Sequence, residues 1–189
     1  MKNQNSEGQA LSTKGKNVFE ADVKLSHFEW TGKKIGGEHK GNISLSKGEV
    51  FLENGKISGA FEIDMASISN TDLAGEWKEK LEGHLKSEDF FGVEKFPTAK
   101  FEITEAIPVE NTESQHLVRG SLTIKEKRHP MEFTANLKVE DGKISAAGEV
   151  SVDRSKYDVR YGSKSFFANI GDKMINDEFN LKFNIVAIK

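Results

Sequence analysis

Alternation of apolar and polar residues with a period of two is the feature that most constrains how this chain folds. In residues 56–65 (KISGAFEIDM), every second residue from Ile57 to Met65 is apolar or glycine, and the residues between them are polar or small. Successive side chains of a strand point to opposite faces of a sheet, so the pattern predicts strands with one buried face, as in antiparallel sheets. The same pattern predicts three more inward faces: Met131, Phe133, Ala135, Leu137 and Val139; Ile144, Ala146, Gly148, Val150 and Val152; Phe179, Leu181, Phe183, Ile185 and Ala187.

Turn dipeptides separate these segments where hairpins require them. Asn54-Gly55 precedes Ile57 and Asp141-Gly142 precedes Ile144, and both dipeptides accept positive φ at low cost. Further strands are expected at residues 18–24, 28–33, 39–45, 99–104 and 117–125. A total of roughly eight or nine strands at this spacing is typical of a sandwich or a barrel.

One segment departs from the β pattern. In residues 73–85 (LAGEWKEKLEGHL), Leu73, Trp77, Leu81 and Leu85 recur every four residues with charged residues between them. This stripe predicts one short helix, although its two glycines weaken it.

Composition limits the classes of protein and partner. The 189 residues suit one domain, with 36% hydrophobic and 30% charged residues. The net charge of -3 comes from dispersed charges, so no basic stripe for nucleic acid is present. The absence of cysteine excludes disulfides and thiolate chemistry. No apolar run is long enough for a transmembrane helix, and the polar residues 1–16 are expected to form a flexible tether before a domain at 17–189.

The sequence offers no catalytic or metal-binding motif. The five histidines show no i, i+4 pairing, and neither a G-x-S-x-G elbow nor a phosphate-binding glycine loop occurs. We therefore expect no catalytic residue and no metal. An enzyme acting on an apolar substrate stays an alternative, with His84 as its acid or base.

Phenylalanine dominates the aromatic residues, with 13 Phe against 2 Tyr and 2 Trp. Rings without a polar tip suit a dry space, which is either a core filled by side chains or an apolar cavity. Small residues on the inward faces leave room or mark bends of the sheet: Gly59, Ala135, Ala146 and Gly148. Composition alone favours the filled core.

The irregular residues 157–179 are expected to form a loop that covers one end of the barrel or forms its mouth. Phe166, Phe167 and Ile170 are the apolar residues of this loop. Arg154, Lys156 and Arg160 are either ordinary solvated charges or cations that meet an anionic group at the mouth.

Residues 83–103 (GHLKSEDFFGVEKFPTAKFEI) resemble the characteristic segment of the YceI-like, polyisoprenoid-binding family. That segment has a His-Leu-x-Ser-x-x-Phe-Phe run before a Phe/Tyr-Pro-Thr-Ala strand opening. Further similarity lies in residues 63–69, 120–133, 150–163 and 171–187. A Gly-x-Thr turn of the family is replaced here by Glu126, Lys127 and Arg128, a departure that concerns a hairpin tip.

The resemblance implies an all-β fold: an extended, eight-stranded, antiparallel, lipocalin-like barrel with the short helix at 73–85. It also implies an apolar tunnel that holds an isoprenoid chain, such as a quinone tail or a polyprenyl phosphate, without chemical change. Family members are often exported to the bacterial periplasm or anchored there as lipoproteins, so we expect that location, and a homodimer is compatible with the sequence. The alternative function is an envelope or stress-related protein-interaction module with a filled barrel.

Ten residues are predicted to line the tunnel, by strand face or loop position. They are Phe28, Trp30, Phe61, Ile63, Phe90, Phe91, Phe101, Phe133, Phe166 and Phe167.

Overall fold

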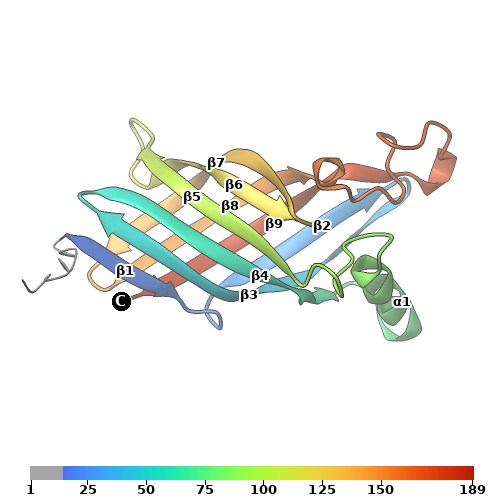
Figure 1. Cartoon of the computed structure of the whole chain (residues 1–189), viewed down its shortest axis with the longest axis horizontal. Helices are drawn as coiled ribbons and strands as arrows, with labels where there is room; N and C mark the ends of the chain where they lie inside the picture. The colour runs from blue at the N-terminus through green and yellow to red at the C-terminus, as the bar shows by residue number, and fades with distance from the viewer. Residues whose placement is uncertain (1–14) are drawn as a thin grey trace, which may run out of the picture.

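One antiparallel sheet makes up most of the molecule and closes on itself (Figure 1). The structure is a computed structural model that describes residues 15–189. Its strands are β1 (Lys16–Ala21), β2 (His27–Lys34), β3 (Gly37–Glu53), β4 (Lys56–Asn70), β5 (Thr98–Pro108), β6 (Gln115–Ile124), β7 (Lys127–Glu140), β8 (Lys143–Asp153) and β9 (Ile175–Ile188). One helix, α1 (Gly75–Lys86), and two short 3-10 turns, at Arg154–Tyr157 and Gly171–Lys173, complete the described chain.

The closure gives a barrel of eight strand positions. Strands β2 to β9 pair in the order β3-β2-β9-β8-β7-β6-β5-β4, and the pairing of β4 with β3 completes the ring. The strands β1 and β2 both pair with β3 and β9, so they occupy one position in succession. The predicted eight-stranded antiparallel barrel with one short helix is therefore confirmed.

The two ends of the barrel differ. Helix α1, the β2–β3 and β6–β7 turns and residues 154–174 gather at one end, which we call the helix end (Figure 1). The opposite end carries the β3–β4, β5–β6 and β7–β8 connections. Residues 1–14 of the predicted tether (residues 1–16) lie outside the described residues. The last residue of the predicted tether, Lys16, is the first residue of β1. Among residues 15–189 there is no helix that is both long and apolar enough to cross a membrane.

Hairpin turns show where backbone conformation limits the sequence. Asn54 and Gly55 have φ of 51° and 77°, the double positive φ that the Asn-Gly pair predicts. Lys125 and Glu126 adopt φ of 49° and 63° in the β6–β7 turn without any glycine. That conformation costs non-glycine residues free energy, and Lys125 Nζ offsets part of the cost by donating to the carbonyl oxygens of Phe90 (3.2 Å) and Asp158 (3.0 Å).

The predicted strand faces agree with the structure except at one strand end. Ile57, Phe61 and Met65 are buried on the inward face of β4. The prediction was wrong at Val139, which is 49% exposed because it lies at the open end of β7, beyond the part of the barrel where inward side chains meet.

Strands β3 and β4 continue beyond their predicted limits through irregular pairing. Between Asn42 and Ser44 of β3, the partner on β4 moves from Ser69 to Asp64, which leaves residues 65–68 as a large bulge. The bulge keeps both Met65 and Ile68 buried inside the barrel.

Helix α1 packs on the barrel through the C-terminal part of its apolar stripe. Leu85 is buried and Leu81 packs against the core, whereas Trp77 is 70% exposed. The short helix predicted at residues 73–85 is found at Gly75–Lys86, so Leu73 precedes it, and Trp77 lies in water because only the C-terminal part of α1 contacts the barrel.

Asp72 fixes the connection between β4 and α1. Its Oδ1 accepts hydrogen bonds from the Lys40 backbone N–H (2.9 Å) and Asn70 Nδ2 (2.6 Å). Its Oδ2 lies 2.8 Å from Nδ1 of His39. Burial acts to raise the pKa of Asp72, but these hydrogen bonds outweigh it and lower the pKa from 3.8 to about 2.

We expect Asp72→Asn to lower stability in a pH-dependent way. A carboxylate whose pKa is lowered in the folded state stabilises the fold at any pH above its pKa in the unfolded chain. This contribution disappears as the pH falls from about 4 to about 2. Urea unfolding should therefore show that the variant loses on the order of 1–2 kcal/mol of the free energy of unfolding at pH 6, and less than that at pH 3. Asp89→Asn, at an exposed site, is the control; an equal loss at both pH values would contradict the assignment.

Candidate ligand-binding lumen

The interior of the barrel contains two apolar cavities placed end to end. The first has a volume of about 100 Å³ and the second, nearer the helix end, about 120 Å³. Five side chains line both cavities: Phe28, Ile63, Leu122, Val152 and Leu181. The lumen is therefore one narrow space divided by a ring of apolar side chains, and it is not filled from end to end.

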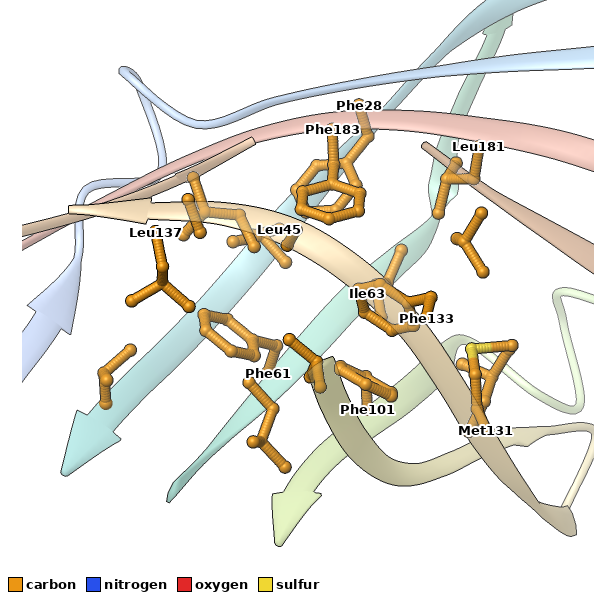
Figure 2. Close-up of a pocket in the computed structure, with 18 of the residues that line it drawn as sticks. Phe28, Leu45, Phe61, Ile63, Phe101, Met131, Phe133, Leu137, Leu181 and Phe183 are labelled. Carbon is orange, nitrogen blue, oxygen red and sulfur yellow. The ribbon is translucent and has the colours of Figure 1, made fainter. Parts of the chain in front are cut away.

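The first cavity has no polar side chain in its wall. Figure 2 shows Phe61, Phe101 and Phe133 pointing inward from β4, β5 and β7. The remaining lining residues are Phe28, Leu45, Val50, Ile57, Ile63, Ile103, Val118, Leu122, Met131, Ala135, Leu137, Ile144, Ala146, Val150, Val152, Leu181, Phe183, Ile185 and Ala187. Several inward side chains, Phe101 and Phe133 among them, keep accessible surface because they face this open space rather than close-packed neighbours.

Four phenylalanine rings form a continuous series along the first cavity. Phe28 lies 6.4 Å from Phe183, Phe183 lies 5.6 Å from Phe133, and Phe133 lies 5.6 Å from Phe101, measured between ring centroids. Such tilted contacts leave ring faces and edges exposed to the lumen.

The second cavity ends against α1 and the loop that follows it. Leu85, Phe90 and Phe91 close it on that side, and Trp30 lies in its wall with its indole N–H donating to the Ser69 carbonyl oxygen (3.1 Å). Besides Trp30, Arg154 and Asn176 are the residues with polar side-chain groups among those that line this cavity.

Eight of the ten residues predicted to line the tunnel face these cavities. Phe61, Phe101 and Phe133 line the first, Trp30, Phe90 and Phe91 line the second, and Phe28 and Ile63 line both. Phe166 and Phe167 lie outside both cavities, exposed on the helix end, because the loop that carries them extends outward. The ligand-binding role of all ten stays a prediction.

Sequence reasoning left out much of the cavity wall. Leu181, Phe183 and Ile185 were placed on an inward face of the sheet but not among the lining residues, although the alternation in β9 was the signal for them. Leu45 and Val50 gave no comparable signal, because the sequence between them (SKGE) resembles a turn while the strand continues through it.

Arg154 holds the loop at the helix end in place. Only 2% of this residue is exposed, and its guanidinium donates to the carbonyl oxygens of Val159, Tyr161, Ile175 and Asn176 at 2.9–3.0 Å. Burial lowers the pKa of Arg154. The negative charge of Asp177, whose carboxylate oxygen lies 3.7 Å from the guanidinium, acts to raise it but does not outweigh burial. Both alternatives for Arg154, a solvated charge or a cation at an open mouth, are corrected here, because the group is enclosed by backbone oxygens. Lys156 and Arg160 are exposed.

His84 lies between the lumen end and the surface. Its ring centroid is 5.7 Å from that of Phe90 and 4.4 Å from that of Tyr161. Its Nε2 atom is buried and has no hydrogen-bond partner among the described residues. Within residues 15–189, no three His, Cys, Asp or Glu side chains are grouped closely enough to hold a metal ion.

Comparison with known proteins identifies the family. The sequence model of the YceI-like domain matches residues 19–187, which is nearly all of the barrel. The chain belongs to the YceI-like family. UPF0312 protein plu2095 of Photorhabdus laumondii is 30% identical over 106 residues, a match that covers 56% of this chain and 52% of that protein. The chain thus spans about half the length of this curated relative.

Solved structures share the YceI-like fold. BcnA of Burkholderia cenocepacia superposes with a TM-score of 0.70 at 22% identity, covering 88% of this chain and 98% of BcnA. A domain of Saccharophagus degradans described as polyisoprenoid binding gives a TM-score of 0.63 at 12% identity, covering 90% of this chain and 97% of that domain. At these identities the likeness concerns the fold.

The residues that resemble the YceI-like family form the closure of the lumen. Ser87 ends α1, where its hydroxyl donates to the His84 carbonyl oxygen (2.7 Å) and its N–H to the carbonyl oxygens of Gly83 and His84. The chain then turns so that Phe90 and Phe91 point back into the second cavity, with ring centroids 5.0 Å apart.

We expect Arg154→Met to destabilise this YceI-like barrel strongly. Methionine retains much of the side-chain volume but leaves four carbonyl oxygens around a buried position without their donor, so the free energy of unfolding should fall by about 3 kcal/mol. Arg160→Met, at an exposed site, should change it by less than about 0.5 kcal/mol. Urea unfolding measures both losses, and equal losses would contradict the role of Arg154.

Proposed function

We propose that this protein binds an apolar isoprenoid-type molecule, such as a quinone tail or a polyprenyl chain, in its lumen and does not change it chemically. The observation that carries the proposal is a cavity inside a closed sheet whose lining side chains are all apolar. Membership of the YceI-like family and the polyisoprenoid-binding description of the S. degradans domain support it.

Apolar burial alone provides the binding free energy that such a site needs. Each methylene removed from water contributes about 0.8 kcal/mol, so a five-carbon isoprene unit contributes roughly 4 kcal/mol before ordering costs. The absence of polar side chains from the first cavity then favours hydrocarbon over polar ligands, because a buried polar group would lose its hydrogen bonds there.

The size of the cavities indicates which ligands to test first. Each is somewhat smaller than an engineered cavity of roughly 150 Å³ that accepts benzene. The lumen as it stands therefore suits short chains, and longer chains require the lining rings to change rotamer. Short-tailed quinones are consequently better probes than long polyprenyl lipids.

The alternative function, a protein-interaction module, required a lumen filled by its own side chains, and the two cavities count against it. Export to the bacterial periplasm and anchoring as a lipoprotein stay predictions of the family resemblance, and a homodimer stays a possibility that the sequence allows. Fractionation of the native host and light scattering of the purified protein would test them.

Fluorescence of Trp30 gives a direct test of lumen binding. Trp30 lines the second cavity, and Trp77→Phe (W77F) removes the only other tryptophan. We expect ubiquinones with one and two isoprene units to quench W77F saturably, with affinity rising with tail length, and the tail-free quinone to bind at least ~10-fold more weakly. If no quinone or prenol binds, the proposal is wrong.

Two neighbouring alanines of β8 provide a matched pair of variants. Ala146 lines the first cavity and Ala147 is exposed on the outer face. In the W77F background, Ala146→Leu should weaken quinone binding by about tenfold or more through loss of volume, whereas Ala147→Leu should leave it unchanged. Melting curves confirm folding of both, and equal affinities would exclude the first cavity as the binding site.

A further inference from the structure

The exposed aromatic side chains of the described chain are all at the helix end, Trp77 on α1 and the other three in the loop at residues 154–174. Exposure is 70% for Trp77, 47% for Tyr161, 39% for Phe166 and 51% for Phe167. Exposed Ile35, in the β2–β3 turn, lies at the same end (Figure 1). We call these five residues the aromatic end surface; contacts within the chain do not account for apolar side chains left in water at one end of the barrel.

A continuous series of aromatic contacts joins this surface to the lumen. Tyr161 contacts His84, His84 contacts Phe90, and Phe90 contacts Phe91 in the wall of the second cavity, with centroid distances of 4.4, 5.7 and 5.0 Å. Trp77 precedes His84 by seven residues, about two helical turns, so the two lie on one face of α1. The surface is therefore the outer side of the lumen closure.

Basic side chains accompany these aromatic residues. The Arg160 guanidinium lies 4.9 Å from the Phe166 ring centroid and also pairs with Asp158. Lys80 Nζ lies 5.1 Å from the Trp77 ring centroid and pairs with Glu76 at 2.7 Å. The carboxylates Glu88, Asp89 and Asp158 also line the hollow beside Tyr161 and Phe167. Within residues 160–173, the positive charges that form no ion pair among the described residues are those of Lys164 and Lys173. Aromatic rings among cations are typical of proteins that lie at the headgroup level of an anionic membrane, whereas protein interfaces are depleted of lysine.

We propose that the helix end docks on an anionic phospholipid bilayer through the aromatic end surface. Phe166 and Phe167 enter the headgroup region, Trp77 and Tyr161 lie at its boundary, and Lys164 and Lys173 meet lipid phosphates. Docking places the Tyr161–His84–Phe90 contacts against the bilayer, where an apolar ligand passes between membrane and lumen without crossing water. Only this last step rests on the proposed function.

The two tryptophans allow docking and ligand binding to be measured separately. Trp30→Phe (W30F) leaves Trp77 as the only tryptophan, and we expect its emission to shift to shorter wavelength with phosphatidylcholine vesicles that contain phosphatidylglycerol. Vesicles of phosphatidylcholine alone, or high salt, should reduce the shift and the amount of protein that sediments with the vesicles. If neither anionic vesicles nor low salt produce a shift or co-sedimentation, docking is wrong.

Matched variants locate the docking surface. Phe166→Ser with Phe167→Ser should weaken vesicle binding by at least ~10-fold. The control is Val23→Ser with Leu25→Ser, because these side chains are 39% and 53% exposed in the β1–β2 connection, away from the helix end (Figure 1). Lys164→Glu with Lys173→Glu should weaken binding to anionic vesicles only, with exposed Lys100→Glu on β5 as its control. Equal effects of test and control variants would overturn the assignment.

The ligand route has its own measurement. With quinone dissolved in the vesicles, transfer into W77F, read from Trp30 quenching, should slow about tenfold or more when Phe166 and Phe167 are both serine, while quinone affinity without vesicles stays the same. If the protein binds quinone but not vesicles, docking is refuted and the proposed function is supported. If it binds vesicles but not quinone, docking is supported and the proposed function is refuted. If the serine pair instead alters self-association or capture of a protein partner, with no vesicle binding, the surface is a protein interface and docking is refuted.

Discussion

Pairing of β3 with β4 closes the sheet, and the rest of the structure depends on this closure. A closed antiparallel sheet satisfies its backbone N–H and C=O groups within the wall, so its interior can be apolar without unpaired polar groups. Eight strand positions give an interior close to the width that side chains can fill. Whether space remains is then decided by a few small residues and by the orientation of large rings.

The small residues on the inward faces differ in whether the space beside them is open or is occupied by other atoms. Ala135 and Ala146 do line the first cavity. The space above Gly148 is occupied, because a Cβ atom there would lie 2.9 Å from the Phe183 ring. At Gly59, a Cβ atom would lie 2.6 Å from the backbone oxygen of Glu49, so this glycine permits the close approach of β3 and β4. Only the alanines thus contribute to an open lumen.

Local sequence patterns predicted the barrel wall well and its two ends poorly, for a physical reason. The inward faces of β4, β8 and β9 follow from alternation, because each strand has the same relation to the lumen along most of its length. At Val139 and Trp77 the pattern continues past the point where the neighbouring elements end, so a residue with the right spacing finds no partner. Long-range placement, which periodicity does not encode, decides those positions.

Arg154 illustrates the same limit for charged residues. Its sequence neighbourhood, with Lys156 and Arg160 nearby, is typical of a solvated loop, and two of these three cations are indeed exposed. Arg154 is buried because backbone carbonyl oxygens from residues 159, 161, 175 and 176 converge on it. Convergence of this kind arises only after β8 and β9 have paired, so no local signal could distinguish Arg154 from its neighbours.

Phe90 connects these features at the helix end. Its backbone oxygen accepts from Lys125, which supports the strained β6–β7 turn, and its ring contacts His84 and Phe91 and lies 5.2 Å from the Arg154 guanidinium carbon. One residue therefore joins the lumen closure, a hairpin tip and the core of the loop at residues 154–174. Because an interior packed in this way responds to displacement at any of its contacts, the closure can open only if the loop and the turn move with it. Residues 83–103, the segment that resembles the family's characteristic one, contain this closure, so the side chains on either side of it depend on their position.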